Sequence, residues 1–247
     1  MSRTAYFDSR ALRFLRELAR HNEREWFHAH KPQYEEHLRQ PYLRLIGDLQ
    51  VPLARISAHF RADPRPLGGS LFRIHRDTRF GKDKTPYKTS AGARFFHERS
   101  RQVEAPVFYL HVQPGRCFVA AGLWHPQPDT LKRVRAFIAD NPAAWIKATR
   151  GSSFKRRYAM GGESLVRPPR GYDPEHPLIA DLRRKDYIAA ADLDDATVTG
   201  PKLREAVLLR FAVQRPHGDT EAAREQAEAL ADLSDPEALL GLTPDER

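Results

Sequence analysis

Two runs with the composition of strands, 107–113 and 116–124, limit the fold of this chain more than any other feature. They are joined by Pro114-Gly115, and a proline followed by a glycine suits the two central positions of a type II turn. The runs are therefore predicted to form an antiparallel hairpin. Strand alternation places Tyr109 and His111 on one face of the first run, opposite three apolar residues: Phe108, Leu110 and Val112.

The residues on both sides of the hairpin have the pattern of helices. Asp8 or Ser9 can cap a first helix, whose apolar residues then recur on one face. Asn22 followed by Glu25 resembles the capping box that starts a second helix. A short strand is expected at 91–96, directly before the hairpin, and helical patterns return after it. Helices, then a meander, then helices argue for an α+β fold and against a parallel α/β sheet.

The same order gives the expected domain organisation. We expect a single α+β domain over residues 1–218, an antiparallel meander with N-terminal and C-terminal helices packed on it. Within this domain, residues 1–66 are expected to be helical, 70–124 to hold the sheet and a basic loop, and 125–218 to be mixed helical and irregular. Residues 219–247 are predicted to form an acidic helical tail.

Charge is unevenly placed along the chain. The formal net charge is +9, but residues 219–247 hold nine acids and two arginines, which leaves +16 on the first 218 residues. This asymmetry predicts that the basic part of the chain interacts with polyanions. The acidic tail would then either keep the protein soluble or compete with those polyanions for the basic surface. The alternative is an arginine-rich composition spread over a soluble surface.

Several classes of protein do not fit this sequence. The start of the chain carries no apolar signal segment, and no run reaches the roughly 18 apolar residues of a membrane helix. Cys117 is the only cysteine, so neither an internal disulfide nor a multi-cysteine zinc site can form. The eleven histidines are scattered without the spacing of metal ligands. We therefore expect a cytoplasmic protein with no membrane partner, no metal and no cofactor.

The stretch between residues 70 and 89 is the best candidate for a functional site. It holds six cations, Arg73, Arg76, Arg79, Lys82, Lys84 and Lys88, against two carboxylates, Asp77 and Asp83. Apolar residues are threaded among the cations, which indicates that a folded core holds them in place. Residues 71–76 are expected to be extended, with Phe72 and Ile74 on one face, and a loop is expected after them.

The cations of this stretch predict an anion-binding site, because clustered guanidinium groups match the oxygens of phosphates and carboxylates. The residues expected to bind the anion are Arg73, Arg76, Arg79, Lys84 and Lys88. Residues 150–177 form a second basic, irregular stretch, and the range 147–170 holds seven cations and one acid. Arg167 and Arg170 of this stretch are expected to close the same cleft. The alternative is that the cations are neutralised in salt bridges by Asp77, Asp83, Glu98 and Glu104, although the two acids within the stretch cannot pair six cations.

A catalytic role is a second hypothesis for the same stretch. His75-Arg76-Asp77 copies the start of a protein-kinase catalytic loop, but Lys82 stands where that loop needs an asparagine, and no glycine-rich loop precedes it. A kinase is therefore excluded. The candidates for proton transfer are Asp77, His75 and His111. The arginines beside Asp77 should lower its pKa and make it a poor base near neutral pH.

Several segments resemble one family of uncharacterised proteins, labelled domain of unknown function 2461. The resemblance is clearest over residues 72–88, Phe-Arg-Ile-His-Arg-Asp-Thr-Arg-Phe-Gly-Lys-Asp-Lys-Thr-Pro-Tyr-Lys. It extends to Asn22-Glu-Arg-Glu-Trp-Phe27, to the hairpin and to Arg167-Pro-Pro-Arg-Gly-Tyr172, and it leaves the acidic tail unmatched. The family label implies no activity, so the resemblance supplies a family and no chemistry.

The sequence leaves three functions open. The first is binding of a phosphorylated small molecule, a nucleic acid or another polyanion through the strand and loop at 73–88. The second is an enzyme that acts on a small phosphorylated metabolite, and the third is a protein-interaction module that uses its basic face. Aromatic residues beside the cations, such as Tyr87 and Tyr172, suit a single-stranded nucleic acid or anchor the loops to the core.

Overall fold

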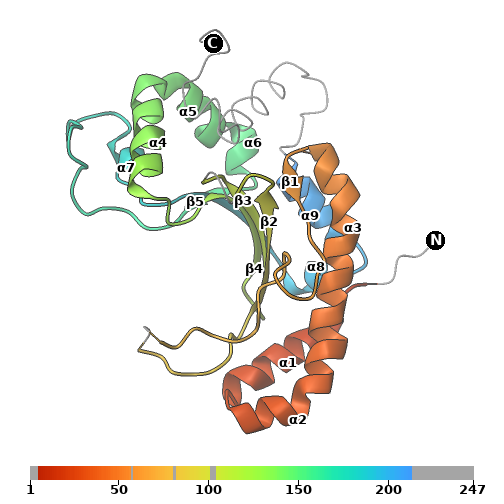
Figure 1. The fold of residues 1–247 in the computed structure, drawn as a ribbon. Helices are drawn as coiled ribbons and strands as arrows, with labels where there is room; N and C mark the ends of the chain where they lie inside the picture. Colours follow the sequence, from red (N-terminus) through yellow and green to blue (C-terminus); the bar gives the residue numbers. More distant parts are fainter. Residues whose placement is uncertain (1–4, 57, 80–81, 101–103, 213–247) are drawn as a thin grey trace. The chain divides into compact units, whose positions relative to one another are not determined.

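The computed structural model describes residues 5–56, 58–79, 82–100 and 104–212, and it shows the expected α+β fold (Figure 1). Its described residues form a six-stranded antiparallel sheet with the strand order β1-β2-β3-β4-β6-β5. The strands are β1 (Phe60–Arg61), β2 (Ala91–His97), β3 (Val107–Val112), β4 (Cys117–Leu123), β5 (Ala159–Gly161) and β6 (Tyr187–Leu193). The three predicted strands are confirmed as β2, β3 and β4, whereas β5 and β6 lie where a mixed helical and irregular segment was expected.

The described chain divides into two compact units. Unit 1 holds the described residues of Met1–Phe96, Phe108–Val119 and Asp192–Ala212, and unit 2 holds those of His97–Val107 and Ala120–Ala191. The predicted domain extent of 1–218 stays a prediction. The acidic helical tail predicted for 219–247 lies outside the described residues.

The helices of unit 1 are α1 (Ser9–Arg20), α2 (Arg24–Tyr34), the π-helix η1 (Glu35–Arg39), α3 (Gln40–Ile56), α8 (Asp195–Thr199) and α9 (Leu203–Phe211). The predicted cap of α1 is confirmed, since the Asp8 carboxylate accepts a hydrogen bond from the Arg10 backbone N–H at 2.8 Å. The predicted capping box of α2 is wrong. The N-cap residue is Glu23, and its side chain makes no capping hydrogen bond. The Asn22 side chain, which the capping box would need, instead binds the backbone of Tyr87.

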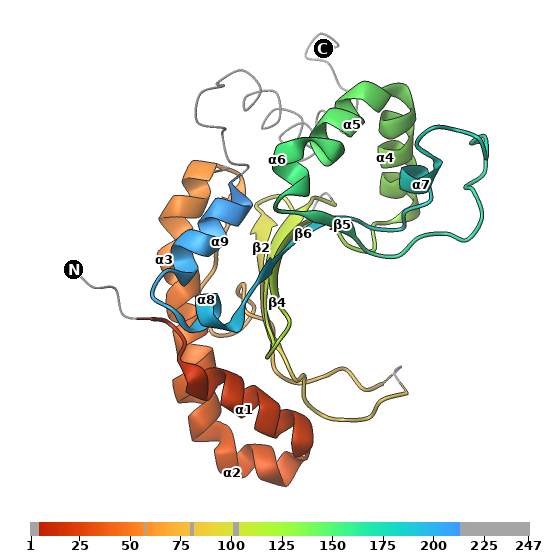
Figure 2. The same ribbon diagram turned by 180° about the vertical axis from the view of Figure 1, so that it is seen from behind.

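One face of strands β2 to β4 forms the core of unit 1. The Phe211 ring of α9 packs on Phe95 and Phe108, with centroids 5.4 and 4.7 Å away. Tyr42 of α3 donates its hydroxyl to the Leu110 carbonyl at 2.9 Å. Figures 1 and 2 show α3, α8 and α9 along this same side of β2 and β4. The predicted alternation of β3 is therefore confirmed, and its odd-numbered residues lie on the opposite face.

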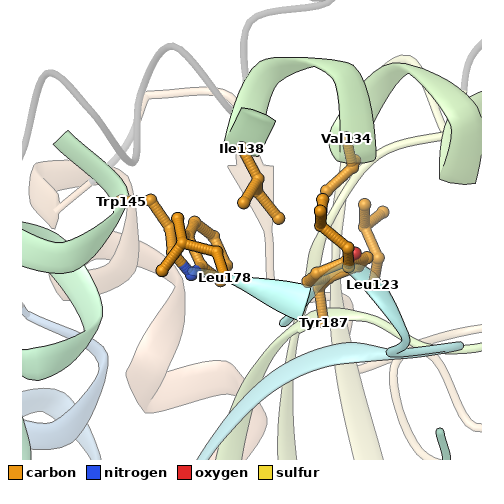
Figure 3. Packing of buried hydrophobic residues seen from close by; sticks show 7 residues of the cluster. Leu123, Val134, Ile138, Trp145, Leu178 and Tyr187 are labelled. Atoms are coloured by element: carbon orange, nitrogen blue, oxygen red, sulfur yellow. The ribbon is translucent and has the colours of Figure 1, made fainter. Parts of the chain in front are cut away.

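Unit 2 has its own apolar core and contains α4 (Pro128–Asp140), α5 (Pro142–Arg150), α6 (Ser152–Lys155) and α7 (Ile179–Leu182). Seven buried residues make up the core (Figure 3): Leu123, Val134, Ile138, Trp145, Leu178, Leu182 and Tyr187. The fully buried Asp186 carboxylate accepts hydrogen bonds from the backbone N–H groups of His125 and Glu163, at 2.7 and 2.9 Å. This carboxylate ties the start of β6 to the residues that follow β4 and β5.

Candidate functional site

Residues 73–88, the basic segment, leave the edge of the sheet and return to it. Leu71 forms an isolated antiparallel bridge with Ala93 of β2, and His75 forms another with Tyr87. The second bridge is closed by hydrogen bonds from Arg76 N to Pro86 O and from Lys88 N to Ile74 O, both 2.8 Å. The expected extended stretch at 71–76 is therefore present only as these two bridges. In Figures 1 and 2 the described parts of this segment project on the side of the sheet away from α3.

The base of the basic segment is anchored to the turn between α1 and α2. The Asn22 amide donates to the Tyr87 carbonyl at 2.9 Å and accepts from the Tyr87 N–H at 3.0 Å. The Phe27 ring stacks on the Tyr87 ring with centroids 4.1 Å apart. Ile74 and Tyr87 are buried, so a core does hold the segment, as predicted. Phe72 differs from Ile74, with 40% of its surface exposed.

Two arginines of the basic segment form ion pairs with its two carboxylates. Arg79 Nη2 lies 2.7 Å from Asp77 Oδ2, and Arg76 pairs with Asp83. The hydrogen bond from Arg79 lowers the pKa of Asp77, and hydrogen bonds from Thr85 lower the pKa of Asp83. The salt-bridge alternative therefore describes Arg76 and Arg79, and Asp77 is a poor general base, as the sequence predicts.

Two of the three lysines are held by backbone carbonyls, which orient an ammonium group without cancelling its charge. Lys84 Nζ donates to the Thr78 carbonyl at 2.8 Å, and Lys88 Nζ donates to the Arg73 carbonyl at 3.1 Å. Burial, with Arg73 nearby, lowers the pKa of Lys88. Arg73 and Lys82 have exposed side chains. Six cations less two carboxylates leave a net charge of +4 on the basic segment.

A row of rings crosses the sheet on the face opposite the core, and we call it the aromatic face. Its members are Phe72, Phe96, Tyr109, His111 and Phe118. Tyr109 lies 6.1 Å from Phe72 and 5.8 Å from Phe118 between ring centroids, and His111 stacks on Phe118 at 4.7 Å. Gly92 makes room for the row, since a Cβ there would lie 2.3 Å from the Tyr109 hydroxyl oxygen.

Two cations lie over the rings of this face. Lys88 Nζ is 5.4 Å from the centroid of Phe72, and the Arg94 guanidinium carbon is 5.9 Å from those of Phe72 and Phe96. Arg94 and Phe96 were not expected in the site. The alternation of β2 was the available signal, because Gly92, Arg94 and Phe96 share one face and Ala93 and Phe95 the other.

The catalytic candidates do not form one constellation. His111 is held at both ring nitrogens, by the Tyr109 hydroxyl at 2.8 Å and by Gln113 Oε1 at 3.0 Å. Burial lowers the pKa of His111 and raises that of Tyr109 to about 12. His75 instead packs edge-on against Phe27. Among the residues the structure describes, no hydrogen bond or ring contact joins His111 to His75 or Asp77.

The remaining expectations concern unit 2, metals and membranes. Arg167 and Arg170 are exposed residues of unit 2, and their part in an anion site stays a prediction. The described residues contain no group of three or more His, Cys, Asp or Glu side chains placed to hold a metal ion. In the same part of the chain, each helix is too short or too polar to cross a bilayer.

Comparison with known proteins identifies a family and no activity. No curated protein and no solved structure shows a significant match to the chain. A family model described as conserved hypothetical protein, domain of unknown function 2461 (DUF2461), matches residues 10–219. Two of the resembling segments, 22–27 and 72–88, contact each other through Asn22, Phe27 and Tyr87. The chain belongs to this family of conserved hypothetical proteins.

Proposed function

We propose that this protein binds a phosphorylated or polyanionic ligand through the basic segment. The observation that carries the proposal is the net charge of +4 on a segment anchored at its base by Asn22. Cations next to an anchored base lose less conformational entropy on binding than cations of a mobile segment do. A polyanion supplies several negative charges along one molecule. This suits Arg73, Lys82, Lys84 and Lys88, which form no ion pair with a carboxylate among the residues that the structure describes.

The ion pairs refine which cations the ligand meets. Arg76 and Arg79 are each compensated by a carboxylate, so they contribute little net potential. Arg73, Lys82, Lys84 and Lys88 carry the remaining charge, and Arg94 lies beside them over the Phe72 ring. A phosphate chain that follows these residues would exchange bound counterions for cations of the protein, so its affinity should depend steeply on salt.

A base-free polyanion tests this proposal. The probe is a fluorescein-labelled abasic 20-mer of deoxyribose phosphate, titrated with the full chain at several salt concentrations and followed by fluorescence anisotropy. The test variant is Arg73→Gln/Lys82→Gln/Lys84→Gln. The control Arg13→Gln/Lys132→Gln/Arg133→Gln removes three exposed cations elsewhere and so changes the net charge equally.

The proposal expects binding by the wild-type chain that weakens as salt rises. The logarithm of the binding constant falls linearly with the logarithm of the salt concentration, and each phosphate contact on a single strand contributes about 0.7 to this slope. Loss of three cations in the test variant should therefore make the slope shallower by about 2. The control triple should change the slope much less. Absence of binding at low salt, or equal losses in the two triple variants, would overturn the proposal.

A further inference from the structure

The aromatic face leaves rings on a sheet surface that the core helices of its own unit do not cover. The contacts of α3 and α9 reach Leu110, Phe95 and Phe108, all on the other face. Phe72 keeps 40% of its surface exposed, and Phe96, Tyr109, His111 and Phe118 are half-buried. Large rings that only filled space in a core would be buried more fully.

Cations lie between and beside these rings, so a ligand of this surface must offer both negative charges and apolar groups. Lys88 and Arg94 flank Phe72, and the basic segment begins at the next residue, Arg73. A purely apolar partner would have to bury these charges without partners, which is costly. An acidic peptide would satisfy the charges but would not need a row of rings. A ligand with regularly spaced anions and flat apolar groups satisfies both.

We infer that the aromatic face stacks the bases of a single-stranded nucleic acid whose phosphates are bound by the basic segment. The inference rests on the proposed function and assigns a ligand class to it. Phe72, Tyr109 and Phe118 form a continuous row with centroid steps of 6.1 and 5.8 Å, so neighbouring bases can meet successive rings. Arg94 adds a guanidinium plane on which a base also stacks.

A single strand fits this surface better than a duplex. The faces of unpaired bases are free to stack on side chains, whereas those of paired bases are covered by their neighbours. Stacking tolerates any base, because every base presents a π-face. The surface therefore predicts binding with little sequence preference and a strong dependence on salt.

The test compares two probes that share one backbone. Full-length protein is titrated with fluorescein-labelled dT20 and with the abasic 20-mer of equal length. The variants are Phe72→Leu, which keeps an apolar side chain and removes the ring, and Phe72→Trp, which keeps a ring. The control is Leu67→Ala in unit 1, which truncates an apolar side chain that is 86% exposed and does not belong to the aromatic face. Circular dichroism confirms that each variant is folded.

The wild-type chain should bind dT20 more tightly than the abasic probe, by about 5- to 140-fold for each base that stacks. Phe72→Leu should lower this ratio by a factor in the same range, because the affinity lost for dT20 should exceed any loss for the abasic probe. Phe72→Trp should restore the ratio, and its added fluorescence should be quenched by dT20 but not by the abasic probe. Leu67→Ala should leave both affinities as they are.

If both probes bind equally to the wild-type chain, or if Phe72→Leu leaves the ratio unchanged, base stacking on this face is refuted while polyanion binding stands. If neither probe binds at low salt, the proposed function fails, and this inference fails with it.

Discussion

Replacing Asn22 by alanine should loosen the base of the basic segment. In the bridge between His75 and Tyr87, the hydrogen bonds are made by the neighbouring residues, so the backbone N–H and carbonyl of Tyr87 point away from His75. The Asn22 amide satisfies both groups, at 3.0 and 2.9 Å, as the backbone of an adjacent strand would. Tyr87 itself is only 2% exposed, so water cannot readily replace the amide.

The expected loss follows from these two hydrogen bonds. Each contributes a net 0.5–1.5 kcal/mol, so Asn22→Ala should lower the free energy of unfolding by about 1–3 kcal/mol. In a chain of this size that corresponds to about 2–4 °C in Tm for each kcal/mol. The backbone around Tyr87 should open more readily than the rest of the chain, because the Tyr87 N–H is the group that loses its acceptor.

Hydrogen exchange measured by mass spectrometry, together with urea unfolding, checks this prediction. Peptides that contain Tyr87 should exchange faster in Asn22→Ala, whereas peptides from α5 should not change. The matched control is Asn141→Ala, which removes an exposed amide that donates to the Phe137 carbonyl at 3.1 Å. If Asn22→Ala destabilises the chain no more than Asn141→Ala does, and exchange at Tyr87 is unchanged, the anchoring role is refuted.

Gly122→Ala should destabilise by about 2 kcal/mol or more in urea unfolding, since φ is +137° and a Cβ would lie 1.9 Å from the Tyr187 carbonyl oxygen; an unchanged midpoint would contradict this. The folded-state pKa of Asp77 is below its ordinary 3.8, so its pairing contributes stability above about pH 4 that is lost as pH falls through the lowered value. The stability difference between wild type and Asp77→Asn should therefore be constant near neutral pH and shrink in acid; an increase in acid would refute the pairing. Burial raises the pKa of Cys117 to about 11, so about a thousandth of it is thiolate at pH 8, and Ellman's reagent should label it slowly until urea is added. Rapid labelling of the native chain would contradict this.

Short-range patterns predicted the elements that need only local chemistry. The turn at Pro114-Gly115 has the expected positive φ of 72° at Gly115, and Arg116 N donates to Gln113 O at 2.9 Å. The alternation of β3 correctly separated Tyr109 and His111 from the core residues. Both results depend on backbone preferences and on a period of two, which a sequence displays directly.

Elements that depend on distant partners were not predictable in this way. β6 (Tyr187–Leu193) contains three consecutive alanines, which have low strand propensity, and it forms a strand where β4 and β5 supply hydrogen-bonding neighbours. Asn22 followed by Glu25 has the spacing of a capping box, yet the amide binds a backbone 65 residues away. A local motif competes with tertiary partners, and here the tertiary partner prevailed.

The two carboxylates of the basic segment position its arginines more than they neutralise the segment. Asp77 holds Arg79 two residues away, and Asp83 holds both Arg76 and the Thr85 backbone N–H. Each pair fixes a long arginine side chain before any ligand binds. The entropy cost of ordering that side chain is therefore not added to the cost of binding. Because four other cations have no carboxylate partner within the segment, this ordering leaves the net charge at +4. Two arginines held by ion pairs, beside cations that keep the net charge strongly positive, suit an anion better than cations that are all free or all paired.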